Sequence, residues 1–210
     1  DFPNHWTVQL NDTHPAIAVA ELMRLLIDQY YISWDKAWSI TTQSVAYTNH
    51  TLLPEALEKW DLHLFNDLLP RHLEIIYEIN WRFLQQLRLR YPGDDKILRK
   101  LSIIDEDGSK SVRMAHLATI GAHHINGVAA LHSDLIKRQL LPEFAKLWPE
   151  KFTNVTNGVT PRRWIALANP GLTNLLEEEL GADWITNMNL LKDLEKKQND
   201  SNFLNKFEET

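Results

Sequence analysis

Three short stretches of the sequence combine polar side chains that could bind a hydroxyl-rich ligand. They are QLNDTHP at residues 9–15, AYTNHT at residues 46–51 and TNGVTPRRW at residues 156–164. Asp12, His14 and His50 supply a carboxylate and two imidazoles, and Asn157 supplies an amide. Protein sites use such groups to hydrogen-bond the hydroxyls of sugars and other polyols. The residue types therefore suggest recognition of a sugar.

Each of these residues also has a structural interpretation, which the residues alone leave open. Asp12 is a favoured helix N-cap residue, with His14 packed below it. A histidine in a mixed polar loop, such as His50, often makes only a structural hydrogen bond. The pair Asn157-Gly158 is typical of a turn.

The elements around these residues place them at strand ends. Residues 6–10 alternate and predict a strand, and residues 16–30 carry the apolar face of a helix. Residues 44–47 predict a second strand, and Pro54 suits the first position of a helix whose positive end would favour Glu58. Strand, polar loop and helix in this order are where open α/β sheets bind ligands.

The rest of the chain is predicted to be mainly helical, with a few scattered strands. Helices are expected over residues 35–43, 71–91, 94–100, 115–124, 129–141, 161–168 and 171–180, with further segments within 183–209. A hairpin pairs residues 101–104 with 111–114, and a short strand covers 152–155. Asn126-Gly127 predicts only a break between two helices. Because the strands are few, we expect their sheet partners to lie outside the chain. The change to consecutive helices predicts a domain boundary near Asn157.

Composition limits the classes of protein that the chain can belong to. Its 210 residues are 44% hydrophobic and 24% charged with a net charge of −6, as in an ordinary globular protein. We find no Lys/Arg-rich run that would bind nucleic acid, and no apolar stretch near the roughly 18 residues of a membrane span. The chain has no cysteine, which excludes disulfides and thiolate metal sites and fits a reducing compartment.

The three polar stretches, taken together and in this order, resemble the α-glucan phosphorylase family of glycogen, starch and maltodextrin phosphorylases. The resemblance covers nearly the whole chain. It implies α/β parentage, in a two-domain glycosyltransferase of the phosphorylase type, with this fragment predominantly α-helical and carrying a few short strands. Residues 1–157 would be the end of the N-terminal domain, and residues 158–210 the first helices of the C-terminal domain. The start at Asp1 without a methionine agrees with an internal fragment.

The resemblance also implies an activity and assigns roles to residues. The reaction is the retaining phosphorolysis of a terminal α-1,4-linked glucose of a glucan to α-glucose 1-phosphate. His50 and Asn157 match catalytic residues that hold the 6-hydroxyl of the reacting sugar, with the His50 carbonyl near the anomeric carbon. Further matches in the substrate pocket are Asp12, His14, Thr51, Glu58, Trp60 and Val128. Trp164 matches a residue that packs near the cofactor pyridoxal phosphate.

Other parts that the resemblance implies are not in this chain. In the full-length enzyme, pyridoxal phosphate is attached to a lysine in a Gly-rich segment of the C-terminal domain, and neither that segment nor the basic residues that hold orthophosphate occur here. We therefore expect the fragment to be inactive alone and to need the rest of its own polypeptide. The parent is expected to be a cytoplasmic homodimer that acts on an α-1,4-glucan and orthophosphate, without nucleic acid or membrane partners.

Three other functions are weighed against this one. A non-catalytic helical carbohydrate-binding module would keep the sugar contacts without chemistry. A glycosidase would need two carboxylates on either side of one glycosidic bond, for which Asp12, Glu55 and Glu58 are candidates. A zinc site would draw on four histidines whose spacing fits one helix face poorly. These are His116, His123, His124 and His132.

Overall fold

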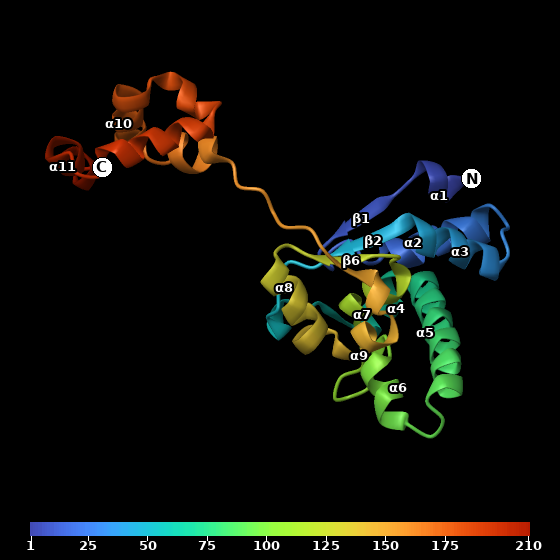
Figure 1. Ribbon diagram of the computed structural model, residues 1–210. Coiled ribbons are helices and arrows are strands. Elements are labelled where there is room, and N and C mark those ends of the chain that lie inside the picture. The colour runs from blue at the N-terminus through green and yellow to red at the C-terminus, as the bar shows by residue number, and fades with distance from the viewer. The chain divides into compact units, whose positions relative to one another are not determined.

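The computed structural model describes all 210 residues and divides into two compact units, residues 1–156 and 157–210 (Figure 1). Both are mainly helical, and all the strands are short, which confirms the predicted fold class. The sequence predicts a domain boundary after Asn157. The assignment of the units to two domains of a parent enzyme stays a prediction. No helix is long and apolar enough to cross a bilayer.

A four-stranded parallel sheet forms the centre of the first unit. Its strands are β1 (Val8–Asn11), β2 (Val45–Thr48), β6 (Ile125–Gly127) and β7 (Phe152–Asn154), in the order β1-β2-β6-β7. Leu10 pairs with Tyr47, Tyr47 with Ile125, and Ile125 with Phe152. Because all four strands are parallel, their carboxyl ends lie along one edge of the sheet.

This sheet corrects two expectations. The strands pair with one another, so they do not depend on partners outside the chain for this sheet. Asn126-Gly127 is not a break between helices but the end of strand β6, between β2 and β7. Local turn propensity was overridden by pairing on both sides, which satisfies the backbone groups of this segment.

Helices connect the strands and supply most of the core. They are α1 (Phe2–His5), α2 (Ala18–Arg24), α3 (Trp34–Ser44), α4 (Leu62–Leu68), α5 (Pro70–Arg90), α6 (Asp95–Leu101), α7 (Met114–Gly121), α8 (Ala130–Leu135) and α9 (Pro142–Leu147). Single π-helical turns extend α2 as η1 (Leu25–Gln29) and α8 as η3 (Ile136–Leu140), and a 3₁₀ turn, η4 (Pro149–Lys151), precedes β7. The long helix α5 buries Leu73, Ile76, Ile79, Phe83 and Leu87 at helical spacing, as predicted. Pro70 occupies its first turn, where proline is tolerated.

The segment after His50 differs from the expected helix. Pro54 begins only a single 3₁₀ turn, η2 (Pro54–Ala56), and the chain then extends into β3 (Lys59–Asp61). This strand joins β5 (Ser111–Arg113) and β4 (Ile104–Asp105) in an antiparallel sheet of order β3-β5-β4. The pairing of β4 with β5 confirms the predicted hairpin. The third strand was missed because its partner lies about 50 residues away in the sequence, where no local pattern reveals it.

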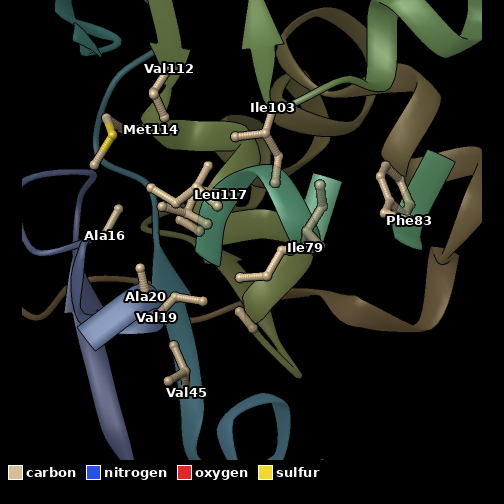
Figure 2. Close-up of a cluster of buried hydrophobic side chains, with 14 of the residues drawn as sticks. Ala16, Val19, Ala20, Val45, Ile79, Phe83, Ile103, Val112, Met114 and Leu117 are labelled. Carbon is tan, nitrogen blue, oxygen red and sulfur yellow. The ribbon is translucent and has the colours of Figure 1, made fainter. Parts of the chain in front are cut away.

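The core lies where α2, α5 and α7 pack together with the two sheets. Figure 2 shows Val19 and Ala20 of α2, Val45 of β2 and Leu117 of α7 in one cluster. Each of them is at most 1% exposed. The cluster anchors the strands whose carboxyl ends carry the polar residues singled out above.

The second unit consists of helical segments around a buried tryptophan. They are η5 (Arg162–Leu167), α10 (Pro170–Leu180), η6 (Ala182–Ile185), η7 (Met188–Lys197) and α11 (Ser201–Glu208). Asn169 caps α10 through the N–H of Leu172, and Gly181 ends it with a φ of 76°. Trp184 is 0% exposed, and the other buried apolar side chains of this unit are Leu175, Leu176 and Phe203.

Candidate functional site

The candidate site of the first unit lies at the carboxyl edge of the parallel sheet. Asp12 directly follows β1, Asn49 and His50 follow β2, and Val128 follows β6. The parallel pairing of these strands brings residues more than 100 positions apart to one edge. Hydrogen bonds across the strand ends then hold their loops together.

Asp12 connects the first two loops. Its Oδ1 accepts the N–H of Thr13 at 2.7 Å, and its Oδ2 accepts the N–H of His50 at 3.1 Å. The residue has a φ of 61° and is 7% exposed. Left-handed backbone is uncommon outside glycine, and Asp is among the residues that tolerate it. Both carboxylate oxygens of Asp12 thus face backbone donors, so a direct sugar contact by Asp12 stays a prediction.

His50 presents its imidazole at the surface with one nitrogen engaged. Its Nε2 lies 2.6 Å from Oδ1 of Asn11. An amide oxygen only accepts, so this geometry assigns the proton to Nε2. In the neutral imidazole, Nδ1 then remains an acceptor for a hydroxyl group. The side chain is exposed, whereas its backbone N–H is fixed by Asp12.

Glu58 lies just before β3, and its side chain reaches the same edge of the parallel sheet. Its Oε2 accepts the hydroxyl of Thr13 at 2.8 Å, and Thr13 is fully buried. The sequence predicts Glu58 on a helix face, but in the structure it lies between η2 and β3 and is hydrogen-bonded to Thr13, the residue after Asp12. Trp60, on β3, packs edge-to-face on Phe65 with ring centroids 5.7 Å apart and is partly buried.

The remaining predicted residues of this edge have different surroundings. His14 is exposed. The hydroxyl of Thr51 accepts the N–H of Leu53 at 3.1 Å, which shapes the loop after His50. The N–H of Val128 donates to Nδ1 of His132 at 3.0 Å.

Sequence reasoning missed three residues of this arrangement. Asn11 contacts the His50 imidazole, Asn49 is fully buried beside it, and His132 on α8 contacts Asn49. Asn11 and Asn49 lie within the polar stretches, and this position is the signal that the sequence holds for them. His132 carries no local signal, because only the pairing of β2 with β6 brings α8 to this edge.

Asn157 and Trp164 belong to the second unit. Both are exposed, and the exposed fraction of Trp164, on η5, is 64%. The convergence of Asn157 with Asp12, His14 and His50 stays a prediction.

The four histidines weighed as zinc ligands occupy separate environments. Nδ1 of His116 faces the carbonyl of Ser102 at 2.9 Å, and His132 is bonded to Asn49. The imidazoles of His123 and His124 face each other, with their Nδ1 atoms 2.7 Å apart. No group of three potential ligands is arranged to hold a metal ion.

A cavity of about 700 Å³ lies elsewhere, at the amino-terminal side of the strands. Its lining includes Thr42, His123 and Lys151, which precede β2, β6 and β7. Burial lowers the pKa of Lys151 to about 8. None of the predicted site residues lines this cavity, so its size does not make it the sugar site.

Comparison with known proteins shows the family of the chain. The model of the carbohydrate phosphorylases matches residues 1–210. The chain is 63% identical over 195 residues to a glycogen phosphorylase of Synechocystis. The matched region covers 93% of this chain and 23% of that protein. It is 53% identical over 204 residues to glycogen phosphorylase 2 of Dictyostelium discoideum, covering 97% of the chain and 20% of that protein. It is 51% identical over 193 residues to the human muscle form of glycogen phosphorylase, and the matched region covers 92% of this chain and 23% of that protein. The chain thus spans about a quarter of the length of these relatives, and it belongs to the carbohydrate phosphorylase family.

Proposed function

We propose that this chain supplies the sugar-binding half of the active site of an α-glucan phosphorylase. The parent reaction is the phosphorolysis of a terminal α-1,4-linked glucose, with retention, to α-glucose 1-phosphate. The observation that carries the proposal is the state of His50. Its imidazole is exposed, while its backbone N–H and its Nε2 are held by Asp12 and Asn11. A side chain fixed on two sides and open on the third is preorganised for a ligand.

His50 acts in two ways in this proposal. Its free Nδ1 accepts the 6-hydroxyl of the reacting glucose, with the amide of Asn157 as the second partner of that hydroxyl. Its main-chain carbonyl dipole stabilises positive charge as it develops at the anomeric carbon. The residues proposed to line the glucan path are Asp12, His14, Thr51, Glu58, Trp60 and Val128. Asp12 and Glu58 also fix the loops through their hydrogen bonds to His50 and Thr13.

The cofactor of the parent enzyme is proposed to be pyridoxal phosphate, bound to a lysine outside this chain. Trp164 is the residue of this chain proposed to pack against it. An indole that is 64% exposed fits that role, because its face is free to receive a planar ring. When bound, the cofactor supplies a phosphate group that relays a proton. We further propose a cytoplasmic, homodimeric parent that uses orthophosphate as co-substrate.

A double-mutant cycle in the full-length enzyme tests the roles of His50 and Asn157. His50→Ala should lower kcat about ten- to a hundred-fold and change KM little, because a hydrogen bond that strengthens with developing charge is worth roughly 1.5–3 kcal/mol. Asn157→Ala should give a related loss, and the two losses should be less than additive, since both residues hold one hydroxyl. His63→Ala, at an exposed position on α4, is the matched control.

The substrate provides the decisive comparison. A glucan whose terminal sugar lacks the 6-hydroxyl should react slowly with the wild-type enzyme and lose little more with His50→Ala. An equal loss on both substrates would contradict the assigned contact. Glucan binding without any phosphorolysis in the wild-type enzyme would favour a carbohydrate-binding module, and phosphate-independent release of glucose would favour a glycosidase.

The chain by itself is proposed to be inactive and to form no Schiff base with the cofactor. Borohydride reduction of the 210-residue chain with pyridoxal phosphate, followed by peptide mapping, should show no stoichiometric labelling at any single lysine. Full labelling at one lysine would contradict the proposal.

A further inference from the structure

We propose that His132 is a positioning residue of the candidate site, whose neutral imidazole fixes Asn49 and, through Asn49, the main chain of His50. The role in turnover rests on the function proposed above. The geometric role concerns residues of the first unit alone and can be tested without turnover.

The partners of His132 define its protonation state. Its Nδ1 lies 3.0 Å from the backbone N of Val128, and its Nε2 lies 3.0 Å from Oδ1 of Asn49. The N–H of Val128 only donates, so Nδ1 accepts; the amide oxygen of Asn49 only accepts, so Nε2 donates. One neutral tautomer satisfies both contacts, and the imidazole spans the ends of β6 and β2.

Asn49 passes this constraint on to His50. It is 0% exposed, its Nδ2 donates to the hydroxyl of Tyr47 at 3.2 Å, and its N–H donates to the carbonyl of Asn126 at 3.0 Å. The next residue, His50, is fixed by the carboxylate of Asp12. The peptide between Asn49 and His50, whose orientation sets the site, is therefore held from both sides.

The close approach of α8 to the sheet makes these contacts possible. A Cβ on Gly127 would lie 2.5 Å from Oγ of Ser133 and 2.8 Å from its backbone N and Cα. The hydroxyl of Ser133 also donates to Asn154 at the end of β7, at 2.7 Å. Only glycine at the end of β6 lets α8 lie this near, and His132 precedes Ser133 on that helix.

Electrostatics favour the neutral form that the hydrogen bonds require. Burial lowers the pKa of His132, nearby His50 lowers it further, and Asp12 opposes the shift. A protonated ring would point an Nδ1–H at the N–H of Val128 and lose that contact.

Two substitutions separate the two contacts. In His132→Gln the side-chain amide can reach the position of Nε2 and donate to Asn49, but it leaves Val128 without its acceptor. In His132→Asn the amide oxygen can take the place of Nδ1, but the contact with Asn49 is lost. His124→Asn, at an exposed position next to β6, is the control.

The first readout is independent of activity. In the 210-residue chain labelled with ¹⁵N, His132→Asn should shift the backbone amide of His50 and its imidazole resonances, whereas His132→Gln should leave them near their wild-type values. Equal shifts in both variants, or none in either, would overturn the proposal. A thermal melt of each variant separates these local changes from general loss of the fold.

The second readout uses the full-length enzyme. His132→Asn should lower kcat about three- to tenfold with little change in KM, and His132→Gln should stay within about twofold of wild type, since one neutral hydrogen bond is at stake. Losses that follow only the melting temperatures would mean that His132 has a merely structural role. If the wild-type enzyme does not phosphorolyse glucans, the proposed function fails, while the shifts at His50 still decide the positioning role.

Discussion

The carboxylate of Asp12 accepts the backbone N–H of His50 at 3.1 Å, although the two residues are 38 positions apart in the sequence. The contact joins the loops after β1 and β2. The other carboxylate oxygen of Asp12 accepts the N–H of Thr13, so the side chain bonds to the backbone of both loops. The residue type alone did not reveal this role. Asp12 thus acts as a connector between loops in this structure.

Asp12→Asn should lower the free energy of unfolding by about 1–3 kcal/mol, because the introduced NH₂ group would face one of two buried N–H donors. Asp12→Ala should cost more, since alanine loses both acceptors and tolerates the left-handed backbone less well than aspartate or asparagine. Urea denaturation measures both. Asp67→Asn, at an exposed position, should change stability by less than about 0.5 kcal/mol, and a similar loss there would contradict the assignment.

Gly127→Ala should destabilise the chain by about 2–3 kcal/mol, since the new methyl group would meet the backbone of Ser133 at 2.8 Å and force α8 away from the sheet. Gly158→Ala is the matched control, because nothing lies within 4 Å of a Cβ at that position. Denaturant unfolding of both variants checks the prediction. Equal stabilities would mean that α8 moves away without cost.

Lys151→Met should raise the free energy of unfolding by about 1–2 kcal/mol at pH 7. The lysine amine lies 4.1 Å from the centroid of Trp148 and 3.4 Å from the carbonyl oxygen of Thr119, and burial lowers its pKa to about 8. The unfolded chain holds this proton up to about pH 10.5, so wild-type stability should rise between pH 8 and 10.5 and the benefit of methionine should shrink there. Lys137→Met, at an exposed position on η3, should have no such effect.

His116 should make the chain sensitive to mild acid. Burial lowers its pKa from 6.5 to about 4, with Arg113 contributing and the hydrogen bond to Ser102 opposing. Between these values the unfolded chain binds a proton that the folded chain does not, so stability falls as the pH drops. His116→Asn should reduce the loss between pH 6.5 and 4.5 by about 2 kcal/mol, measured as urea midpoints. Unchanged pH dependence in this variant would contradict the assignment, and His63→Asn, at an exposed position, is the control.

Local sequence patterns predicted the elements that bury one clear face. The 3.6-residue spacing of Leu73, Ile76, Ile79, Phe83 and Leu87 identified α5. Alternation identified the strand that became β1, and a run of apolar and β-branched residues identified β2. The order of the polar stretches predicted the family, which the match over residues 1–210 confirms. The helix and the strands could be predicted because their side-chain periodicity depends only on neighbours in the sequence.

Non-local pairing decided what the sequence could not. Asn126-Gly127 has the residues of a turn but forms the end of β6, because β2 and β7 lie on either side of it. The segment after Pro54 begins like a helix but joins β5, about 50 residues away. The contacts of Asp12 with His50 and of His132 with Asn49 follow from that pairing. The sequence by itself determined which polar groups the site has to draw on. Only the tertiary structure decided which of them hold the loops and which remain exposed, because hydrogen bonds between strand ends depend on which strands are neighbours.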